Sequence, residues 1–217
     1  MMTNLFSTFD PSTGIMSLNW MSMLIMFLLP ENYWNLKGKM QSMISKMNTM
    51  LSKEMKMLSN HKGTTIIMIS LFNMILINNM MGLFPYVYTS SAQISVSLTL
   101  ALSLWTAMML FGWIKKTNDM LCHLVPVGTP GPLMPFMVMI ESVSNMIRPG
   151  SLAVRLSANM IAGHILMSLL GNSLTEKSTL IFIFMWLFMG LMIFELAVAF
   201  IQAYVFMTLS NLYSSEI

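Results

Sequence analysis

The longest apolar run in the sequence constrains the fold more than any other feature. Residues 180–209 are thirty positions of nearly unbroken apolar sequence, interrupted by Glu195 and Gln202. At about 1.5 Å per residue, a helix of this length is ~45 Å long, whereas the hydrocarbon core of a bilayer is ~30 Å thick. We therefore expect a membrane-embedded helix that is strongly tilted or curved.

The composition of the whole chain agrees with a membrane protein. The 217 residues are 56% hydrophobic and 9% charged, with a mean hydropathy of +0.70, whereas soluble domains average about 25% charged residues. We expect a single membrane domain over residues 1–217 with several spans. The net charge of +3 does not indicate nucleic-acid binding, because the lysines flank hydrophobic segments, where they set membrane orientation.

Cysteine and methionine usage argues against a metal site or other cofactor. The single cysteine, Cys122, excludes an internal disulfide and a multi-cysteine metal site. The 29 methionines are spread over every segment. This spread favours a compositional bias, with Met as an adaptable apolar filler, over a Met-based metal site. The N-terminus lacks the basic amphipathic character of a transit peptide, so we expect synthesis inside an organelle or a bacterium.

The pattern of apolar runs predicts an all-α membrane protein. Its expected parts are a first transmembrane helix over 10–29, an amphipathic interfacial helix over 36–60, a transmembrane pair over 64–84 and 94–114, and two long tilted membrane-embedded helices over 133–171 and 178–210. We expect the two long helices to form a hairpin around the polar turn 172–179. Pro149-Gly150 predicts a break or kink in the first of them.

The lysines predict the orientation of the chain. Six of them fall within residues 31–63, where apolar residues recur at spacings of three and four, so this helix should lie in the membrane interface. A calmodulin-target helix is the alternative, and predicted spans on both sides argue against it. Lys115 and Lys116 belong on the same side as these six. The C-terminus then lies on the lysine side, and the N-terminus and residues 172–179 lie opposite.

Three polar clusters interrupt the two long helices. Arg155 lies within apolar sequence, where a charge at membrane depth costs ~3 kcal/mol or more, so it is a functional-site hypothesis. At about 100° per residue, Asn159 shares its face and His164 lies half a turn away. Glu195 and Gln202 are seven residues apart and share a face of their helix. If the two long helices pack together, His164 joins these two residues in a second cluster. The third lies toward the lysine side and consists of Glu141 and Asn145, with Arg148 seven residues after Glu141.

Each polar residue also has a structural alternative. Asn159 can join helices through hydrogen bonds, His164 can be a satisfied core histidine, and Arg155 can form a salt bridge with Glu195. His61 and His123 are interpreted as ordinary surface histidines. The sequence contains no Walker loop, dinucleotide-binding fingerprint, His-pair haem pattern or Ser-His-Asp arrangement.

Residues 153–164, Ala-Val-Arg-Leu-Ser-Ala-Asn-Met-Ile-Ala-Gly-His, closely resemble the signature helix of the subunit a family of F-type ATP synthases, called subunit 6 in mitochondria. Residues 79–86, 123–130 and 141–149 also match this family. Glu195 and Gln202 fall where the family has its last polar pair. The methionine bias and the short length are similar to invertebrate mitochondrial members.

The resemblance implies a non-enzymatic stator subunit of the Fo proton channel that couples proton translocation to rotation and ATP synthesis. Its partners would be the c-ring, subunit b, small membrane subunits and lipid, with cardiolipin plausible, and it would bind neither nucleotide nor nucleic acid. The chain would lie in the mitochondrial inner membrane as a multi-pass protein, with its N-terminus in the intermembrane space and its C-terminus in the matrix.

The resemblance also implies roles for individual residues. Arg155 matches the essential arginine that faces the c-ring between two offset half-channels, and Asn159 matches the polar residue one turn on. The half-channel from the intermembrane space would contain His164, Glu195 and Gln202, and the matrix half-channel Glu141. Bacterial members often exchange the His and acid between positions 164 and 195, which suggests that the two positions are close. Secondary polar positions would be Asn145, Arg148 and Asn79.

Two other classes of protein are considered. A secondary transporter or channel would use Arg155 as a substrate anchor, but the sequence shows no internal repeat of the kind that transporters often contain. A non-transporting assembly subunit of a respiratory complex would keep the arginine merely paired. Co-purification with a ring of small hairpin subunits would distinguish the leading hypothesis from both.

Overall fold

The structure, a computed structural model, describes residues 5–12, 16–28, 36–58, 62–125, 128–176 and 181–216. Over these ranges the regular structure is entirely helical, which confirms the all-α prediction. Four helical segments within them are long and apolar enough to cross a membrane, judged by length and composition: Gly63–Gly82, Ile94–Lys115, Gly131–Ser173 and Phe182–Ser215.

The described residues form α-helices and shorter 3-10 helices. The α-helices are α1 (Lys39–Leu58), α2 (Lys62–Gly82), α3 (Ile94–Lys115), α4 (Thr117–His123), α5 (Met134–Glu176) and α6 (Ile181–Glu216). The 3-10 helices are η1 (Leu5–Phe9), η2 (Leu18–Leu28), η3 (Ser90–Ala92) and η4 (Gly131–Leu133).

Two segments differ from the sequence-based expectation. The connection between the predicted helices 94–114 and 133–171 contains the short helix α4, and α5 continues to Glu176 instead of ending at residue 171. A helix can continue from apolar into polar sequence because its backbone hydrogen bonds are local. Of the predicted turn 172–179, residues 177–179 lie outside the described ranges.

The N-terminal segment is not the continuous helix predicted over 10–29. Asp10 to Ser12 are not helical, and η2 begins only at Leu18 and has 3-10 geometry. Residues 13–15 and 29 lie outside the described ranges. At ~2.0 Å per residue, the 11 residues of η2 extend about 22 Å. That this segment crosses the membrane therefore stays a prediction.

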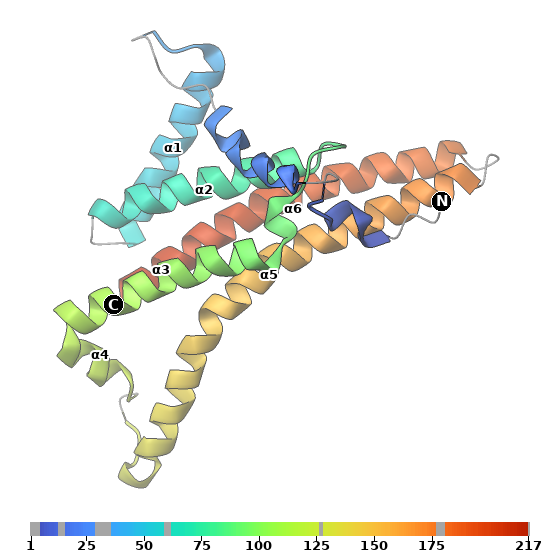
Figure 1. The fold of residues 1–217 in the computed structure, drawn as a ribbon. Helices are drawn as coiled ribbons and strands as arrows, with labels where there is room; N and C mark the ends of the chain where they lie inside the picture. The colour runs from blue at the N-terminus through green and yellow to red at the C-terminus, as the bar shows by residue number, and fades with distance from the viewer. Residues whose placement is uncertain are drawn as a thin grey trace.

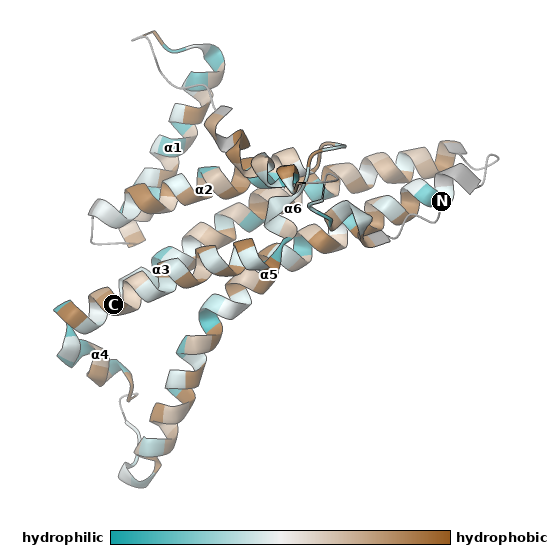
Figure 2. Cartoon of the chain, in the orientation of Figure 1, coloured by the Kyte–Doolittle hydropathy of each residue, from teal (hydrophilic) through white to brown (hydrophobic). Residues whose placement is uncertain are grey.

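The long helices pack side by side. α6 packs against both α2 and α5, and α3 packs against α5 (Figure 1). α1 contacts α2 and α6 and runs steeply across their direction (Figure 1). Hydrophilic residues occur on α1, near α4 and at a few points along α5 (Figure 2). The two long helices thus hold their polar residues within an otherwise apolar assembly.

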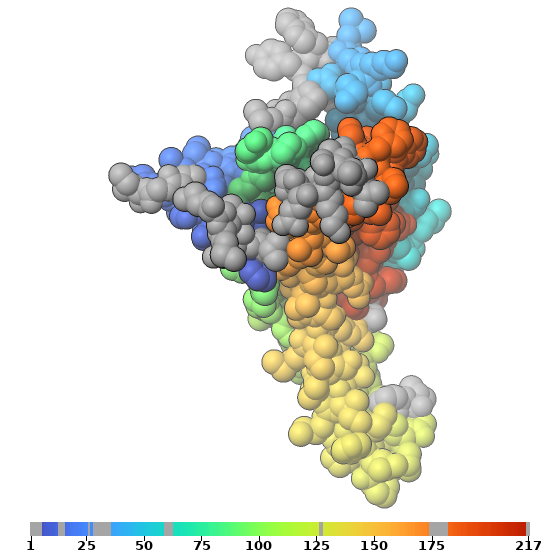
Figure 3. All heavy atoms as spheres, turned by 90° about the vertical axis from the view of Figure 1, so that its right-hand side faces the viewer, coloured from blue at the N-terminus to red at the C-terminus, as the bar shows by residue number. Residues whose placement is uncertain are grey.

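α5 contains a proline and remains one continuous helix. Pro149 is buried and lies within α5, and the helix continues on both sides of it from Met134 to Glu176. A proline lacks the amide hydrogen and clashes with the preceding turn, so it kinks a helix that continues through it. α5 changes direction part-way along its length (Figure 1), and its first half (yellow) extends away from the other long helices (Figure 3).

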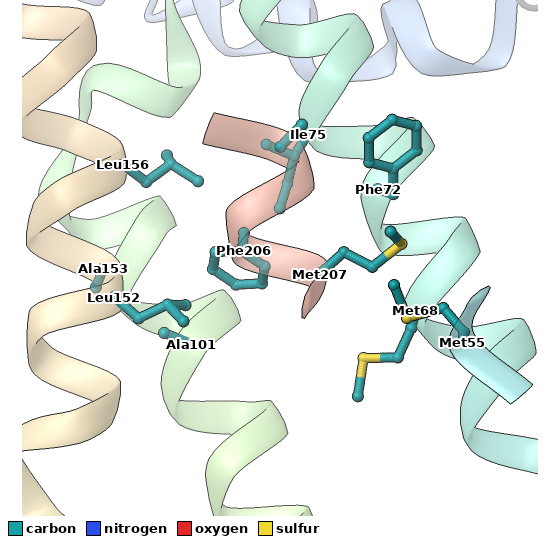
Figure 4. Close-up of a cluster of buried hydrophobic side chains, with 11 residues drawn as sticks. Met55, Met68, Phe72, Ile75, Ala101, Leu152, Ala153, Leu156, Phe206 and Met207 are labelled. Carbon is teal, nitrogen blue, oxygen red and sulfur yellow. The ribbon is translucent and has the colours of Figure 1, made fainter. Parts of the chain in front are cut away.

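The core joins five helices through small and flexible side chains (Figure 4). Its buried members are Met55 from α1, Met68, Phe72 and Ile75 from α2, Ala101 from α3, Leu152, Ala153 and Leu156 from α5, and Ala203, Phe206 and Met207 from α6. The alanines allow close approach, and the methionines fill irregular gaps. Asn211 on α6 is completely buried and donates from Nδ2 to the Met55 carbonyl at 3.4 Å, which ties α1 to the bundle.

Candidate functional site

Three contacts show that α5 and α6 run antiparallel along most of their common length. Asn159 donates from Nδ2 to the Gln202 Oε1 at 2.9 Å. Gly163, one turn later on α5, contacts Glu195. In the opposite direction, the Arg148 guanidinium lies 5.1 Å from the ring centre of Tyr213. Each step forward on α5 is matched by a step back on α6, and this register places Asn159 opposite Gln202 and Gly163 opposite Glu195.

Gly163 provides the space that the Glu195 side chain occupies. Glu195 is only 5% exposed. A Cβ added to Gly163 would lie 2.7 Å from the Glu195 Oε1, and closer still to Oε2 and Cδ. Real Cβ atoms essentially never come so close to a heavy atom. The Glu195 carboxyl group therefore lies directly against the α5 backbone at Gly163. Gly163 is the residue immediately before His164.

Asn159 does not share the exposure of Arg155, although both were expected on one face. Its side chain is half-buried and pairs with Gln202. The hydrogen bond crosses the interface between α5 and α6, which is the helix-joining alternative considered for this asparagine. The register of the two helices places Gln202 opposite Asn159, and the predicted grouping of Gln202 with His164 and Glu195 stays a prediction.

Arg155 lies on an exposed stripe of α5. The exposed positions recur at spacings of three and four: Ser151, Arg155, Ala158, Ala162, Leu166 and Leu169. Arg155 is the only charged residue on this stripe. Among the described residues it has neither an ion pair nor a hydrogen bond, so the alternative of an Arg155–Glu195 salt bridge is not formed there. The cation points away from the chain's own packed interior.

His164 lies on the other side of α5 and contacts the N-terminal segment. Its ring meets the Phe9 ring edge-to-face, with centroids 6.1 Å apart and an interplanar angle of 89°. The Nε2 atom is buried and finds no hydrogen-bond partner within the described part of the chain. In the described part of the chain, His164 is therefore not a core histidine with a fully hydrogen-bonded ring. Within the described ranges, no hydrogen bond joins His164 to Glu195 or Gln202.

Asn79 on α2 adds a second buried polar group without a partner. It is completely buried, and neither its Oδ1 nor its Nδ2 has a hydrogen-bond partner among the described residues. The Ser91 Oγ on η3 is also buried without a hydrogen-bond partner among the described residues. η3 packs against both α2 and α5. An unsatisfied buried polar group costs about 1–3 kcal/mol, and ordered water commonly removes this cost.

The third predicted cluster lines a cavity of about 450 Å³ between α3, α4 and α5. Glu141 and Arg148 form an ion pair there at 3.8 Å (Oε1 to Nη2), and Asn145 also lines the cavity. His123 on α4 is exposed and faces the same cavity, although it was interpreted as an ordinary surface residue. The position of His123 in the family-like segment 123–130 is the sequence signal that could have indicated this location.

These features define a class of protein: a multi-span helical membrane protein whose two longest helices separate an exposed cation from buried, incompletely paired polar groups. A family model described as "ATP synthase A chain" matches residues 14–215. The chain is similar to "ATP synthase subunit a" of Locusta migratoria (53% identity over 224 residues), Anopheles gambiae (51% over 225) and Drosophila melanogaster (52% over 223). Each comparison covers 100% of this chain and 100% of the relative.

The chain therefore belongs to the ATP synthase subunit a family. It is a non-catalytic subunit of the Fo proton channel, acting in ion transport and ATP synthesis within the complex. It is an integral membrane protein, and a location in the mitochondrial inner membrane is consistent with its insect relatives.

Proposed function

We propose that this chain is the stator half of a proton path in which Arg155 separates two offset half-channels and faces a ring of c subunits. The observation that carries the proposal is the exposure of Arg155 as the only charge on its stripe of α5, without a partner among the described residues. Ala158 and Ala162 follow it on the same stripe, and small residues let a neighbouring helix approach closely.

The chemistry follows from the cost of charge in lipid. A carboxylic acid on the ring is neutral while it faces hydrocarbon, and it ionises when it comes opposite a fixed cation. Arg155 thus gives each ring carboxylate one place at which to release its proton, and its positive charge opposes direct proton leakage between the half-channels. One proton crossing 100 mV provides ~2.3 kcal/mol, which drives rotation of the ring.

The half-channel on the N-terminal side would use His164, Glu195 and Gln202, with Asn79 as a secondary group. What supports this assignment is that the His164 Nε2 and the Asn79 amide are buried without partners in the described part of the chain. Such atoms attract ordered water. Gln202 is held by Asn159 at 2.9 Å, so these two amides would form the boundary between this path and the Arg155 stripe.

The half-channel on the lysine side would use the cavity between α3, α4 and α5. Glu141 is half-buried at its wall, and Asn145 and Arg148 lie beside it. The Glu141–Arg148 distance of 3.8 Å is long for a direct hydrogen bond, so water can enter between the two side chains.

The placement in the membrane follows from the distribution of lysines. The N-terminus would lie in the intermembrane space, the C-terminus in the matrix, and the 10–29 segment would be the first transmembrane segment. α1 would lie in the matrix-side interface, because it carries exposed lysines together with exposed Met40, Met43, Met47 and Met50. We expect subunit b, small Fo subunits and lipid such as cardiolipin to cover the remaining apolar surfaces.

The test is Arg155→Ala in the assembled complex. We expect loss of proton-driven ATP synthesis, because no fixed cation would remain to ionise the ring carboxylate. Ser151→Ala, one turn earlier on the same exposed stripe, is the matched control and should retain synthesis. ATP synthesis by the assembled Arg155→Ala complex under a proton gradient would contradict the proposal.

A further inference from the structure

The N-terminal segment lies against the part of α5 that carries His164. η1 packs on α5, and Figure 1 shows this segment (dark blue) beside the second half of α5 (orange). Phe9, the last residue of η1, is half-buried and places its ring edge-to-face with His164. Such ring pairs are worth about 0.5–1.5 kcal/mol beyond the area they bury, so they restrict the orientation of both rings.

The backbone of Phe9 is held by the connection between α2 and α3. The Phe9 carbonyl accepts a hydrogen bond from Gln93 Nε2 at 2.9 Å and one from the Tyr88 hydroxyl at 3.4 Å. Gln93 Nε2 also donates to the Tyr88 oxygen at 2.8 Å. The Trp20 ring, from η2, contacts the Tyr88 ring at 5.8 Å. The N-terminal segment is thus tied to the bundle at the residue that touches His164.

Tyr88 can serve as a permanent donor in this arrangement. Burial raises the pKa of the Tyr88 phenol above its usual range; the hydrogen bond from Gln93 acts in the opposite direction, and the nearby Asp10 carboxylate raises the pKa further. The net result is a phenol that stays protonated at physiological pH and keeps its hydrogen available for the Phe9 carbonyl.

We propose that Phe9 is a positioning residue for His164: anchored through its carbonyl by Gln93 and Tyr88, it fixes the orientation of the imidazole and covers it on the N-terminal side. Water and protons from that side would then reach His164 past the edge of Phe9, with Asp10 at the outer end of the cover. The proposal rests on the proposed role of His164 in the half-channel of this side, and it names the element that controls access to it.

The test measures access to position 164 directly. In the assembled complex, with Cys122→Ser to remove the native thiol, His164→Cys reports reaction with a membrane-impermeant thiol reagent added on the intermembrane side. We expect Phe9→Ala to increase the labelling rate at least about fivefold, because a ring-sized gap opens above position 164. Phe9→Tyr, which keeps the ring, should restore the slow rate. Phe6→Ala is the matched control, because Phe6 lies in the same helix and is 68% exposed.

A second variant tests the anchor without touching the ring. Gln93→Leu removes the 2.9 Å hydrogen bond to the Phe9 carbonyl and should raise the labelling rate in the same direction as Phe9→Ala. In complexes that keep His164, ATP synthesis should fall in Phe9→Ala and recover in Phe9→Tyr, while Phe6→Ala stays unchanged.

The outcomes separate this inference from the function on which it rests. Equal labelling rates in Phe9→Ala, Phe6→Ala and the parent would overturn the role of Phe9, while labelling of position 164 from this side would still support the half-channel. If position 164 is unreactive from the intermembrane side in every variant, including Phe9→Ala, both the half-channel assignment and the role of Phe9 are wrong.

Discussion

Gly163 shows how one missing side chain decides the position of another. The Glu195 carboxyl occupies the space in which a Cβ of residue 163 would lie. In the interior of a helix, glycine is less favourable than alanine by about 1 kcal/mol. The glycine therefore lowers the stability of the α5 helix. In return, it leaves room for the Glu195 carboxyl group between α5 and α6.

We predict that Gly163→Ala impairs proton translocation. The new methyl group overlaps the Glu195 carboxyl, and such overpacking costs about 1–3 kcal/mol unless the carboxyl moves. Proton-driven ATP synthesis should fall roughly tenfold, as expected for ~1.4 kcal/mol of added barrier. Combining it with Glu195→Asp, which withdraws the carboxyl by one methylene, should recover part of the loss.

Gly171→Ala is the matched control for this substitution. Gly171 lies on the same helix, and a Cβ there would meet nothing within 4 Å. Its activity should equal that of the parent. If both alanine variants behave alike, the effect comes from helix propensity and the steric explanation fails.

At the scale of the element, the bend in α5 divides the helix into two working parts. The part after Pro149 packs in the bundle and carries Arg155, Asn159 and His164, whereas the part before it diverges and lines the cavity that contains Glu141. Because the proline interrupts the local backbone hydrogen bonds, the two parts can follow different directions. A straight helix would close the angle that opens this cavity.

We predict that Pro149→Ala straightens α5. The alanine amide restores the hydrogen bond that proline lacks, so spin labels at the exposed positions Met139 and Leu166 should move apart by several ångström in a pulsed-EPR distance measurement. Gly150→Ala is the control, since a Cβ at Gly150 meets nothing within 4 Å. An unchanged distance in Pro149→Ala would mean that tertiary packing, and not the proline, sets the bend.

At the scale of the whole molecule, the ends of the helices divide into two sides. The start of α2, the end of α3, α4 and the end of α6 belong to one side, with Lys115, Lys116 and Cys122. The connection between α2 and α3 belongs to the other, with Phe84 exposed at 59%. The positive-inside rule predicts that the lysine side faces the matrix.

We predict that these two sides label from opposite compartments. In sealed inner-membrane vesicles, the exposed Cys122 should react with an impermeant thiol reagent only from the matrix face. In a Cys122→Ser background, Phe84→Cys should react only from the intermembrane face. Labelling of both positions from the same face would require a different number of membrane crossings between them.

The predictions from sequence were best where a single helix carries the information. The apolar runs located α2, α3 and α6, and the cost of a charge in lipid singled out Arg155, which is exposed on α5. The 10–29 segment was predicted less well, because its short apolar run is compatible with 3-10 as well as α-helical geometry. Phe9 was not singled out at all, and Gly163 was noted only as part of the motif 153–164, since a phenylalanine and a glycine have no distinctive pattern without their contacts.

The sequence by itself determined that the chain is helical and enters a membrane, which side carries the lysines, and that Arg155 lies half a turn from His164. These properties depend on hydropathy, charge and the period of one helix. Only the tertiary structure decided that Asn159 pairs with Gln202, that Glu195 lies on Gly163, and that Phe9 lies on His164. The helical period defines directions around one axis, whereas the register and rotation of neighbouring helices result from many weak packing contacts summed over the whole bundle.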